Sequence, residues 1–419
     1  MKLLFWCPRV LATALAGPLA AQAAVDLSLK LDVNFGHNSN LFRVDNPSNT
    51  TPGDGPGPAT PLVKSSTQMQ SIELGMGIPL GSEQTRLILT TSLGRMGYSA
   101  RPDLDHSPTS FNATLPWRFT DRLEGEVSAG YTRTAYAFDD FYPLRDITRR
   151  NWTQATISLL ATPSLSFPVT VSRQSLRHED QATHIFLDFD AQRISASGLY
   201  RSTTGSNAQL GFARSETSYP GRAAPGATTA PKENDNDVFM EVNWQLTPIT
   251  LASLRWANRE RSFDNGRDAT RTNLYRLGLA HTFSAQLQLD AQLWRLPSNS
   301  TQQGILDGTS TGRRIGMRYL PNPKWDVAAS WQQQTDRNDV FGDAPGLVAP
   351  NPDTTNIGIR GRYHVDSRLT AYLDLGWEKR VRRQTANATQ QIMRIGVEYR
   401  FENIPGSTGR NRVPNLQTF

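Results

Sequence analysis

Apolar and polar residues alternate along most of this chain. The pattern is clearest in Gln391–Phe401, which reads QIMRIGVEYRF. Successive side chains of a β-strand point to opposite faces, so the apolar residues at odd positions from Met393 to Phe401 share one face. Two arginines, a glycine and a glutamate share the other face. This segment is therefore predicted to be a strand with one apolar and one polar side.

The same period of two recurs from Leu27–Phe35 to the segment just described, and eighteen such runs can be counted. No apolar run beyond the N-terminus reaches the roughly 18 residues that a membrane-spanning helix needs. The pattern predicts an all-β fold. The intervening runs are Ile72–Leu80, Leu87–Leu93, Phe111–Phe119, Leu123–Tyr131, Ala155–Ala161, Leu165–Val171, Ile194–Tyr200, Ala208–Phe212, Val238–Leu246, Leu254–Trp256, Tyr275–Phe283, Leu287–Leu293, Ile315–Tyr319, Trp325–Trp331, Ile357–Val365 and Leu369–Trp377.

The connections between these runs alternate in length. Eight are short turns such as Thr120-Asp121, and nine are longer segments such as Asn46–Pro61, Ser215–Asn236 and Gln333–Thr354. Tight periplasmic turns and long outer loops are typical of outer-membrane barrels. We therefore predict a transmembrane antiparallel up-and-down β-barrel of about 18 strands (16–18). A soluble sandwich or propeller has no reason to alternate its loops in this way.

Aromatic residues near the ends of the runs support the same fold. Trp and Tyr side chains are enriched where a barrel meets the two membrane–water interfaces. A soluble β-protein would instead bury its apolar face in a core. The residues suited to such girdles are Trp117, Tyr131, Trp244, Trp256, Tyr319, Trp325, Trp377 and Tyr399.

The N-terminus has the features of a secretory signal. Lys2 and Arg9 flank a short apolar stretch that continues to Ala20, and Ala21-Gln22-Ala23 resembles a cleavage site. Residues 1–23 are predicted to be a signal peptide, 24–401 the barrel and 402–419 a C-terminal tail; a short membrane anchor is the alternative for the first segment. The single cysteine, Cys7, lies in the signal, so the mature chain is predicted to contain no disulfide.

Charge adds little to this picture. The chain carries 44 Lys and Arg against 38 Asp and Glu, a net charge of +6. Loss of Lys2 and Arg9 would reduce the excess to about +4, spread along the chain. This distribution does not indicate nucleic acid as a partner.

The polar faces of the later runs carry a predicted basic patch in the lumen. Its arginines fall on the fourteenth, sixteenth and eighteenth runs, and acids of the fifth and tenth runs are expected to oppose them. Guanidinium groups pair well with carboxylate and phosphate, so the patch could guide an anionic polymer or solute. A structural ladder of Arg–Glu pairs is the alternative. The patch comprises Arg314, Arg318, Arg360, Arg362, Arg394 and Arg400.

No enzymatic site is predicted. The six histidines are scattered without metal-ligand spacing, and no nucleophile elbow, phosphate-binding loop or dinucleotide fingerprint occurs. We therefore predict no catalytic residue, no cofactor and no metal site.

The closing run also resembles a recognition signal. Arg394–Phe401 contains a polar residue, Gly396, Tyr399 and the terminal aromatic Phe401 in the order found in the last strand of outer-membrane barrels. The resemblance implies that these residues are read by the barrel assembly machinery.

Two segments resemble a family of outer-membrane barrels. His37–Arg43 (HNSNLFR) is similar to the DxNLFR segment of the EpsL-type β-barrel porin family, which is encoded with exopolysaccharide biosynthesis genes, although a histidine replaces the acidic residue. Tyr200–Ser206 (YRSTTGS), Leu210–Arg214 and Tyr219-Pro220 resemble a second part of the family's pattern. The overall layout of the mature chain is similar to that of the family. Neither motif is catalytic, so the resemblance implies no active-site residue.

The resemblance implies a role in exopolysaccharide export or assembly in the outer membrane of a Gram-negative bacterium, with a polar-lined conduit as one form of that role. Its partners would be outer-membrane lipid, the polysaccharide and periplasmic export components. Two alternatives stay open: a general or substrate-specific diffusion porin, and a structural or adhesive barrel. A loop folded into the lumen would favour the porin, and Ser215–Asn236 and Gln333–Thr354 are the candidate loops.

Overall fold

The computed structural model describes residues 25–41, 62–82, 85–135, 145–179, 187–222, 232–264, 268–297, 305–340, 352–381 and 387–403. These residues form eighteen β-strands and two short 3-10 helices, η2 (Pro102–Leu104) and η4 (Pro220–Arg222). The predicted all-β fold is confirmed. The strands are β1 (Asp26–Asn38), β2 (Ser65–Ser82), β3 (Thr85–Tyr98), β4 (Thr109–Thr120), β5 (Leu123–Ala135), β6 (Ile147–Thr162), β7 (Leu165–His178), β8 (Phe189–Arg201), β9 (Asn207–Ser218), β10 (Lys232–Thr247), β11 (Thr250–Phe263), β12 (Thr270–Thr282), β13 (Leu287–Pro297), β14 (Ile305–Asn322), β15 (Trp325–Val340), β16 (Asp353–His364), β17 (Leu369–Val381) and β18 (Ala388–Glu402).

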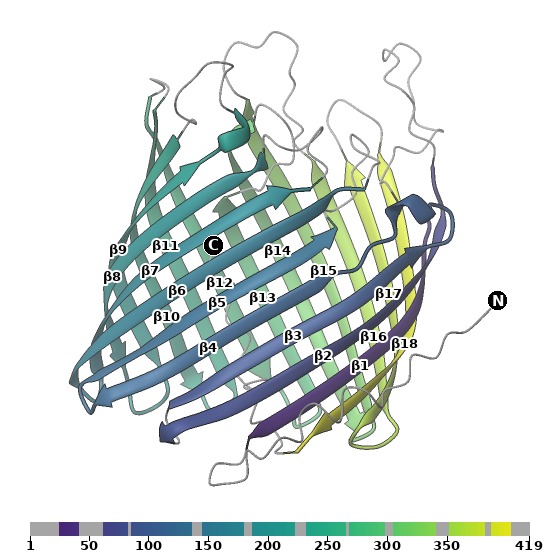
Figure 1. Cartoon of the computed structure of the whole chain (residues 1–419), viewed down its shortest axis with the longest axis horizontal. Coiled ribbons are helices and arrows are strands. Elements are labelled where there is room, and N and C mark those ends of the chain that lie inside the picture. Colours follow the sequence, from purple (N-terminus) through teal and green to yellow (C-terminus); the bar gives the residue numbers. More distant parts are fainter. Residues whose placement is uncertain are drawn as a thin grey trace.

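The strands close into a barrel (Figure 1). Each strand pairs antiparallel with the next one along the chain, and β1 also pairs with β18, with Leu31 opposite Tyr399. Closure leaves no strand edge unpaired, and this allows a β-sheet to cross a lipid bilayer. At the seam, the backbone N–H of Leu27 donates to the Asn403 side chain at 2.6 Å.

The two faces of the wall have opposite chemistry. The outer face exposes large apolar side chains, among them Ile157 (53%), Ile194 (52%) and Phe212 (68%). The inner face holds buried polar side chains such as Asn34 and Asp237. A water-soluble protein would show the reverse, so the exposed apolar band is the surface that faces lipid. The aromatic residues predicted for the girdles all lie on this outer face by register.

Short and long connections alternate as predicted. The turn between β4 and β5 is Asp121-Arg122, and that between β8 and β9 contains Gly205, whose φ of +88° favours glycine. Two predicted loops are shorter than expected, because β9 and β10 occupy both ends of Ser215–Asn236 and β15 and β16 both ends of Gln333–Thr354. Strand pairing continues there after the apolar alternation has stopped.

Within the described residues, no helix has the length and apolar character required to cross a membrane. The predicted signal peptide (1–23), the loop Asn46–Pro61 and nearly all of the predicted tail (402–419) lie outside the described residues. The end of β18 at Glu402 agrees closely with the end expected for the barrel, and the division into three segments stays a prediction.

Candidate functional site in the lumen

Strand register places the six arginines of the basic patch on the inner face. Arg318 of β14, Arg360 of β16 and Arg394 of β18 lie in one row across the sheet, with Ala328 of β15 and Asp374 of β17 between them. Neighbouring strands are about 4.8 Å apart, so cations on alternate strands follow one another at roughly 10 Å. The register thus places three of the six arginines in one row and the other three in nearby rows of the same three strands, a group called here the arginine stripe.

Half of the patch is paired with carboxylates. The Arg318 guanidinium donates two hydrogen bonds to Asp326, at 3.0 and 2.9 Å. Arg360 does the same to Asp374, at 2.6 and 3.1 Å. Arg400 donates to Glu398 at 2.8 Å, and that carboxylate also contacts Lys30 at 3.1 Å.

The other half is not paired in this way. Arg314, Arg362 and Arg394 form no hydrogen bond or ion pair with any residue that the structure describes. Arg362 lies beside Asp326 and Tyr372 in the register, one row from Arg360. The stripe is thus both a structural ladder and a source of positive charge directed at the lumen.

A second charged region was not predicted. On β10 and β11, Asp237 receives two hydrogen bonds from Arg259 (2.8 and 3.1 Å), and Asp235 receives two from Arg261 (2.7 and 3.0 Å). Arg193 of β8 also donates to Asp237, at 2.9 Å. The side chains of Asp237 and Arg259 are only 2% and 12% exposed. The signal for this ladder was the period-two alternation of charge in KENDND and NRER.

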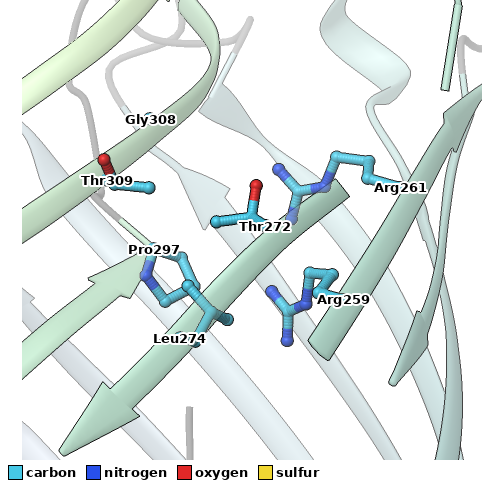
Figure 2. A pocket seen from close by; sticks show the side chains of 7 residues that line it. All are labelled: Arg259, Arg261, Thr272, Leu274, Pro297, Gly308 and Thr309. Carbon is cyan, nitrogen blue, oxygen red and sulfur yellow. The ribbon is translucent and has the colours of Figure 1, made fainter. Parts of the chain in front are cut away.

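The pockets beside this ladder are too small for a solute. Figure 2 shows Arg259 and Arg261 extending from β11 toward Thr272 and Leu274, around a pocket of about 10 Å³. A neighbouring pocket, lined by Arg193 and the residues around Arg259, measures about 20 Å³. Each has room for about one water molecule. Neither pocket therefore offers a binding site for a larger molecule.

The acids expected to oppose the basic patch lie on other parts of the wall. Glu241 of β10 is four strands from β14 and lies beside Arg255 in the register. Glu124 and Glu126 are on the inner face of β5, nine strands from β14 and thus on the opposite wall. Glu124 accepts a hydrogen bond from Arg118 at 2.8 Å. Eighteen strands give a barrel roughly 35 Å across between backbones. Because salt screens charges beyond about 10 Å, the two walls act on a solute separately.

An apolar cluster lies at the outer mouth, near the long-loop ends of β1 and β3. Leu41, Tyr98 and Leu104 are buried against one another, with Val63 and Met96 packed beside them. Tyr98 and Met96 are on the inner face of β3, so the cluster lies on the lumen side of the wall.

Backbone hydrogen bonds hold the cluster in place. The N–H of Leu41 donates to the carbonyl of Val63 at 2.9 Å, and that of Met96 to His106 at 2.8 Å. These hydrogen bonds continue the β1–β2 and β3–β4 pairing beyond the strand ends, so the cluster packs on the inner face of this part of the wall. The expected constrictions from Ser215–Asn236 and Gln333–Thr354 are only partly described, and their described ends continue the wall.

The predicted assembly residues lie on both faces of β18. Gly396 is on the inner face beneath the Tyr372 ring, where a Cβ would lie 2.6 Å from the phenol oxygen. Tyr399 and Phe401 are on the lipid-facing side, and the guanidinium of Arg368 lies 5.6 Å from the centre of the Phe401 ring. Recognition by the assembly machinery stays a prediction.

Within the described residues, no group of three or more His, Cys, Asp or Glu side chains could hold a metal ion. His178 has two carboxylates nearby: its Nδ1 lies 2.8 Å from Asp188 and its Nε2 lies 3.8 Å from Asp146. This group lies at the outer end of β7, away from the arginine stripe.

Comparison with known proteins identifies the fold. No protein-family model and no curated protein sequence matches the chain. Among solved structures, OpdQ of Pseudomonas aeruginosa superposes with a TM-score of 0.52 at 10% identity, covering 91% of this chain and 100% of that chain. OccK2 (OpdF) of the same organism gives 0.53 at 10% identity, covering 90% and 98%. OccK5 (OpdH) gives 0.50 at 11%, with the same coverage.

The matched structures and the wall described above define the class of protein. The chain is an eighteen-stranded transmembrane β-barrel of the outer-membrane type, similar in fold to OpdQ and OccK2. Identities of 10–11% limit this likeness to the fold. The resemblance to the EpsL-type family stays a prediction, since no family model matches.

Proposed function

We propose that this barrel is a substrate-selective channel for small, anionic, hydrophilic solutes. The observation that carries the proposal is the stripe on β14, β16 and β18, in which Arg314, Arg362 and Arg394 form no hydrogen bond or ion pair with a described residue. A guanidinium that is not engaged in this way can pair with a carboxylate or phosphate that enters the lumen. Salt-bridged neighbours hold the stripe in a fixed geometry.

The arrangement suits passage better than tight binding. Conduction requires sites that attract a solute but release it to the next site. The row from Arg318 through Arg360 to Arg394 offers cations at intervals of roughly 10 Å, and two of these three already share their charge with an aspartate. An anion can therefore pass from one arginine to the next along the row and stay close to a positive charge.

Ion selectivity in planar bilayers tests the proposal. The Arg362→Glu/Arg394→Glu variant should lower the chloride-to-potassium permeability ratio by about three-fold or more, because local charge sets the local ion concentration. Arg295→Glu/Arg337→Glu is the matched control, since both residues are on the outer face and the charge change is the same. Equal effects in the two variants, or no effect in the first, would contradict an anion path along this stripe.

A second candidate is export or assembly of an exopolysaccharide. It rests on the resemblance of His37–Arg43 and Tyr200–Ser206 to the EpsL-type pattern. In the fold, Asn40 is buried and donates to the Thr389 carbonyl at 3.0 Å, and Gly205 shapes the β8–β9 turn. The described parts of both motifs thus have structural roles, which explains their sequence without requiring a polymer.

Extracellular polysaccharide from a strain lacking the gene, compared with the complemented strain, separates the two candidates. Loss of exported polymer with material held in the periplasm would support export. Normal export together with impaired uptake of small anions would support the channel. The barrel assembly machinery and periplasmic export components remain proposed partners.

A further inference from the structure

The lipid-facing surface has a feature unrelated to the lumen. By register, twelve lysine and arginine side chains point outward from the strands, and all lie in the half of their strand next to the long loops. They are Arg95, Arg133, Arg149, Arg173, Arg177, Arg214, Lys232, Arg271, Arg295, Arg313, Arg337 and Lys379.

The opposite half of the outer face differs. No strand residue whose side chain is described points a charge outward there. Only four described strand carboxylates face outward, and they too lie at the long-loop end. They are Asp190, Glu216, Glu260 and Asp353. The belt is therefore positive on balance and confined to one membrane interface.

The belt is densest on β5–β9. Arg133, Arg149 and Arg177 are direct neighbours across β5, β6 and β7. Glu179 accepts from Arg133 at 2.7 and 2.8 Å and from Arg149 at 2.5 Å, which holds two of these cations close together. The Arg149 side chain is still 55% exposed.

Two more arginines of this segment lack any such partner. Arg173 and Arg214 are exposed and form no hydrogen bond or ion pair with a described residue. In the register, Gln192 lies beside Arg173 and Ile194 beside Arg214, so the two cations are on alternate strands, β7 and β9. The exposed apolar residues Val171 (53%) and Phe212 (68%) lie immediately below them. Cations thus stand directly above a surface for acyl chains.

We infer that the β5–β9 segment binds a phosphate-bearing glycolipid of the outer leaflet. Its phosphates would contact Arg173, Arg214 and the neighbouring group of Arg133, Arg149 and Arg177, and its acyl chains would lie on the apolar band below. Arginine pairs with phosphate through two parallel hydrogen bonds, and clusters of basic residues beside a membrane-spanning segment are typical of anionic lipid binding. The inference concerns the outer face and does not depend on the proposed transport function.

Native mass spectrometry of the full barrel in mild detergent tests this inference. The probe is bisphosphorylated lipid A, with its dephosphorylated form as the comparison ligand. The Arg173→Gln/Arg214→Gln variant should bind the phosphorylated form roughly 30-fold more weakly, as expected for the loss of two cations near a charged headgroup. Arg295→Gln/Arg337→Gln is the control, because these residues are also exposed, outward-facing and without described partners.

Three outcomes would overturn the inference. They are equal binding of the two lipid forms, equal loss in both double variants, and an added mass equal to a second copy of the chain instead of a lipid. If the first variant fails to assemble, the wild-type barrel still decides the matter. Its binding should prefer the phosphorylated lipid and weaken as salt is raised, and binding without phosphate preference would contradict the proposal.

Discussion

At the scale of single residues, the inner wall depends on small side chains beneath large ones. Gly396 allows the Tyr372 ring to lie against the backbone of β18, and the Tyr372 hydroxyl donates to Asp32 at 3.0 and 3.1 Å. This contact links β17, β18 and β1 across the seam of the barrel. The glycine predicted as part of an assembly signal therefore also has a packing role in the folded wall.

Gly396→Ala is expected to destabilise the barrel by about 1–3 kcal/mol, as overpacking does in well-packed interiors. The added methyl would lie 2.7 Å from the Cβ of Asn34 as well as close to Tyr372. Urea-induced unfolding in detergent measures the change. Gly361→Ala is the control, since nothing lies within 4 Å of a Cβ there. Equal stability of the two variants would mean that Tyr372 moves aside without cost.

At the scale of elements, the sequence predicted strands well where one face is apolar. Leu369–Trp377 lies within β17, and the closing run lies within β18. The prediction failed where strands extend beyond the lipid and both faces become polar. There, Glu233, Asp235 and Asp237 alternate with asparagines, and only the pairing with β9 and β11 shows that the segment is a strand. Which arginine pairs with which acid depends on register, and the sequence alone does not specify register.

The ladder between β10 and β11 should contribute strongly to stability. Asp237→Ala leaves Arg259 and Arg193 without their shared carboxylate, and the loss of one partner of a buried ion pair costs about 3–5 kcal/mol. Glu260→Ala is the matched control, because its pair with Arg271 is exposed (44% and 75%) and such pairs are worth about 1 kcal/mol or less. The urea concentration at the midpoint of unfolding measures the loss of stability in each of the two variants. Similar losses would indicate that water screens the Asp237 site.

At the scale of the whole molecule, the barrel has three chemically distinct surfaces. The lumen carries the arginine stripe, the lipid-facing side carries the basic belt, and the outer mouth carries the apolar cluster of Leu41, Tyr98 and Leu104. The same strands build the first two surfaces, because successive side chains along a strand point alternately to the lumen and to the lipid. The third surface forms from segments that follow β1 and β3, and no periodic pattern in the sequence marks it.

The outer mouth should respond to acid through His106. Its ring stacks on Tyr98 at 6.1 Å, and Nδ1–H donates to the Leu104 carbonyl at 3.0 Å. Burial lowers the pKa of His106 below its ordinary value of 6.5, with the nearby Arg133 and Arg145 acting in the same direction. The unfolded segment therefore binds the proton more readily than the folded one. Stability of the cluster is complete above pH 6.5 and declines as the pH falls toward the lowered value.

Single-channel recordings between pH 7.5 and 5.5 measure this response. In the wild-type barrel, acidification should loosen the mouth and increase current fluctuations, because a protonated ring cannot stay desolvated beside Tyr98 without cost. His106→Gln removes the titrating group but keeps an amide that can donate to Leu104, so its fluctuations should not change over this range. If both channels respond equally to pH, another group controls the mouth. If neither channel responds to pH, the cluster tolerates a charged His106. Its role is then confined to packing between the β1–β2 and β3–β4 pairs of strands.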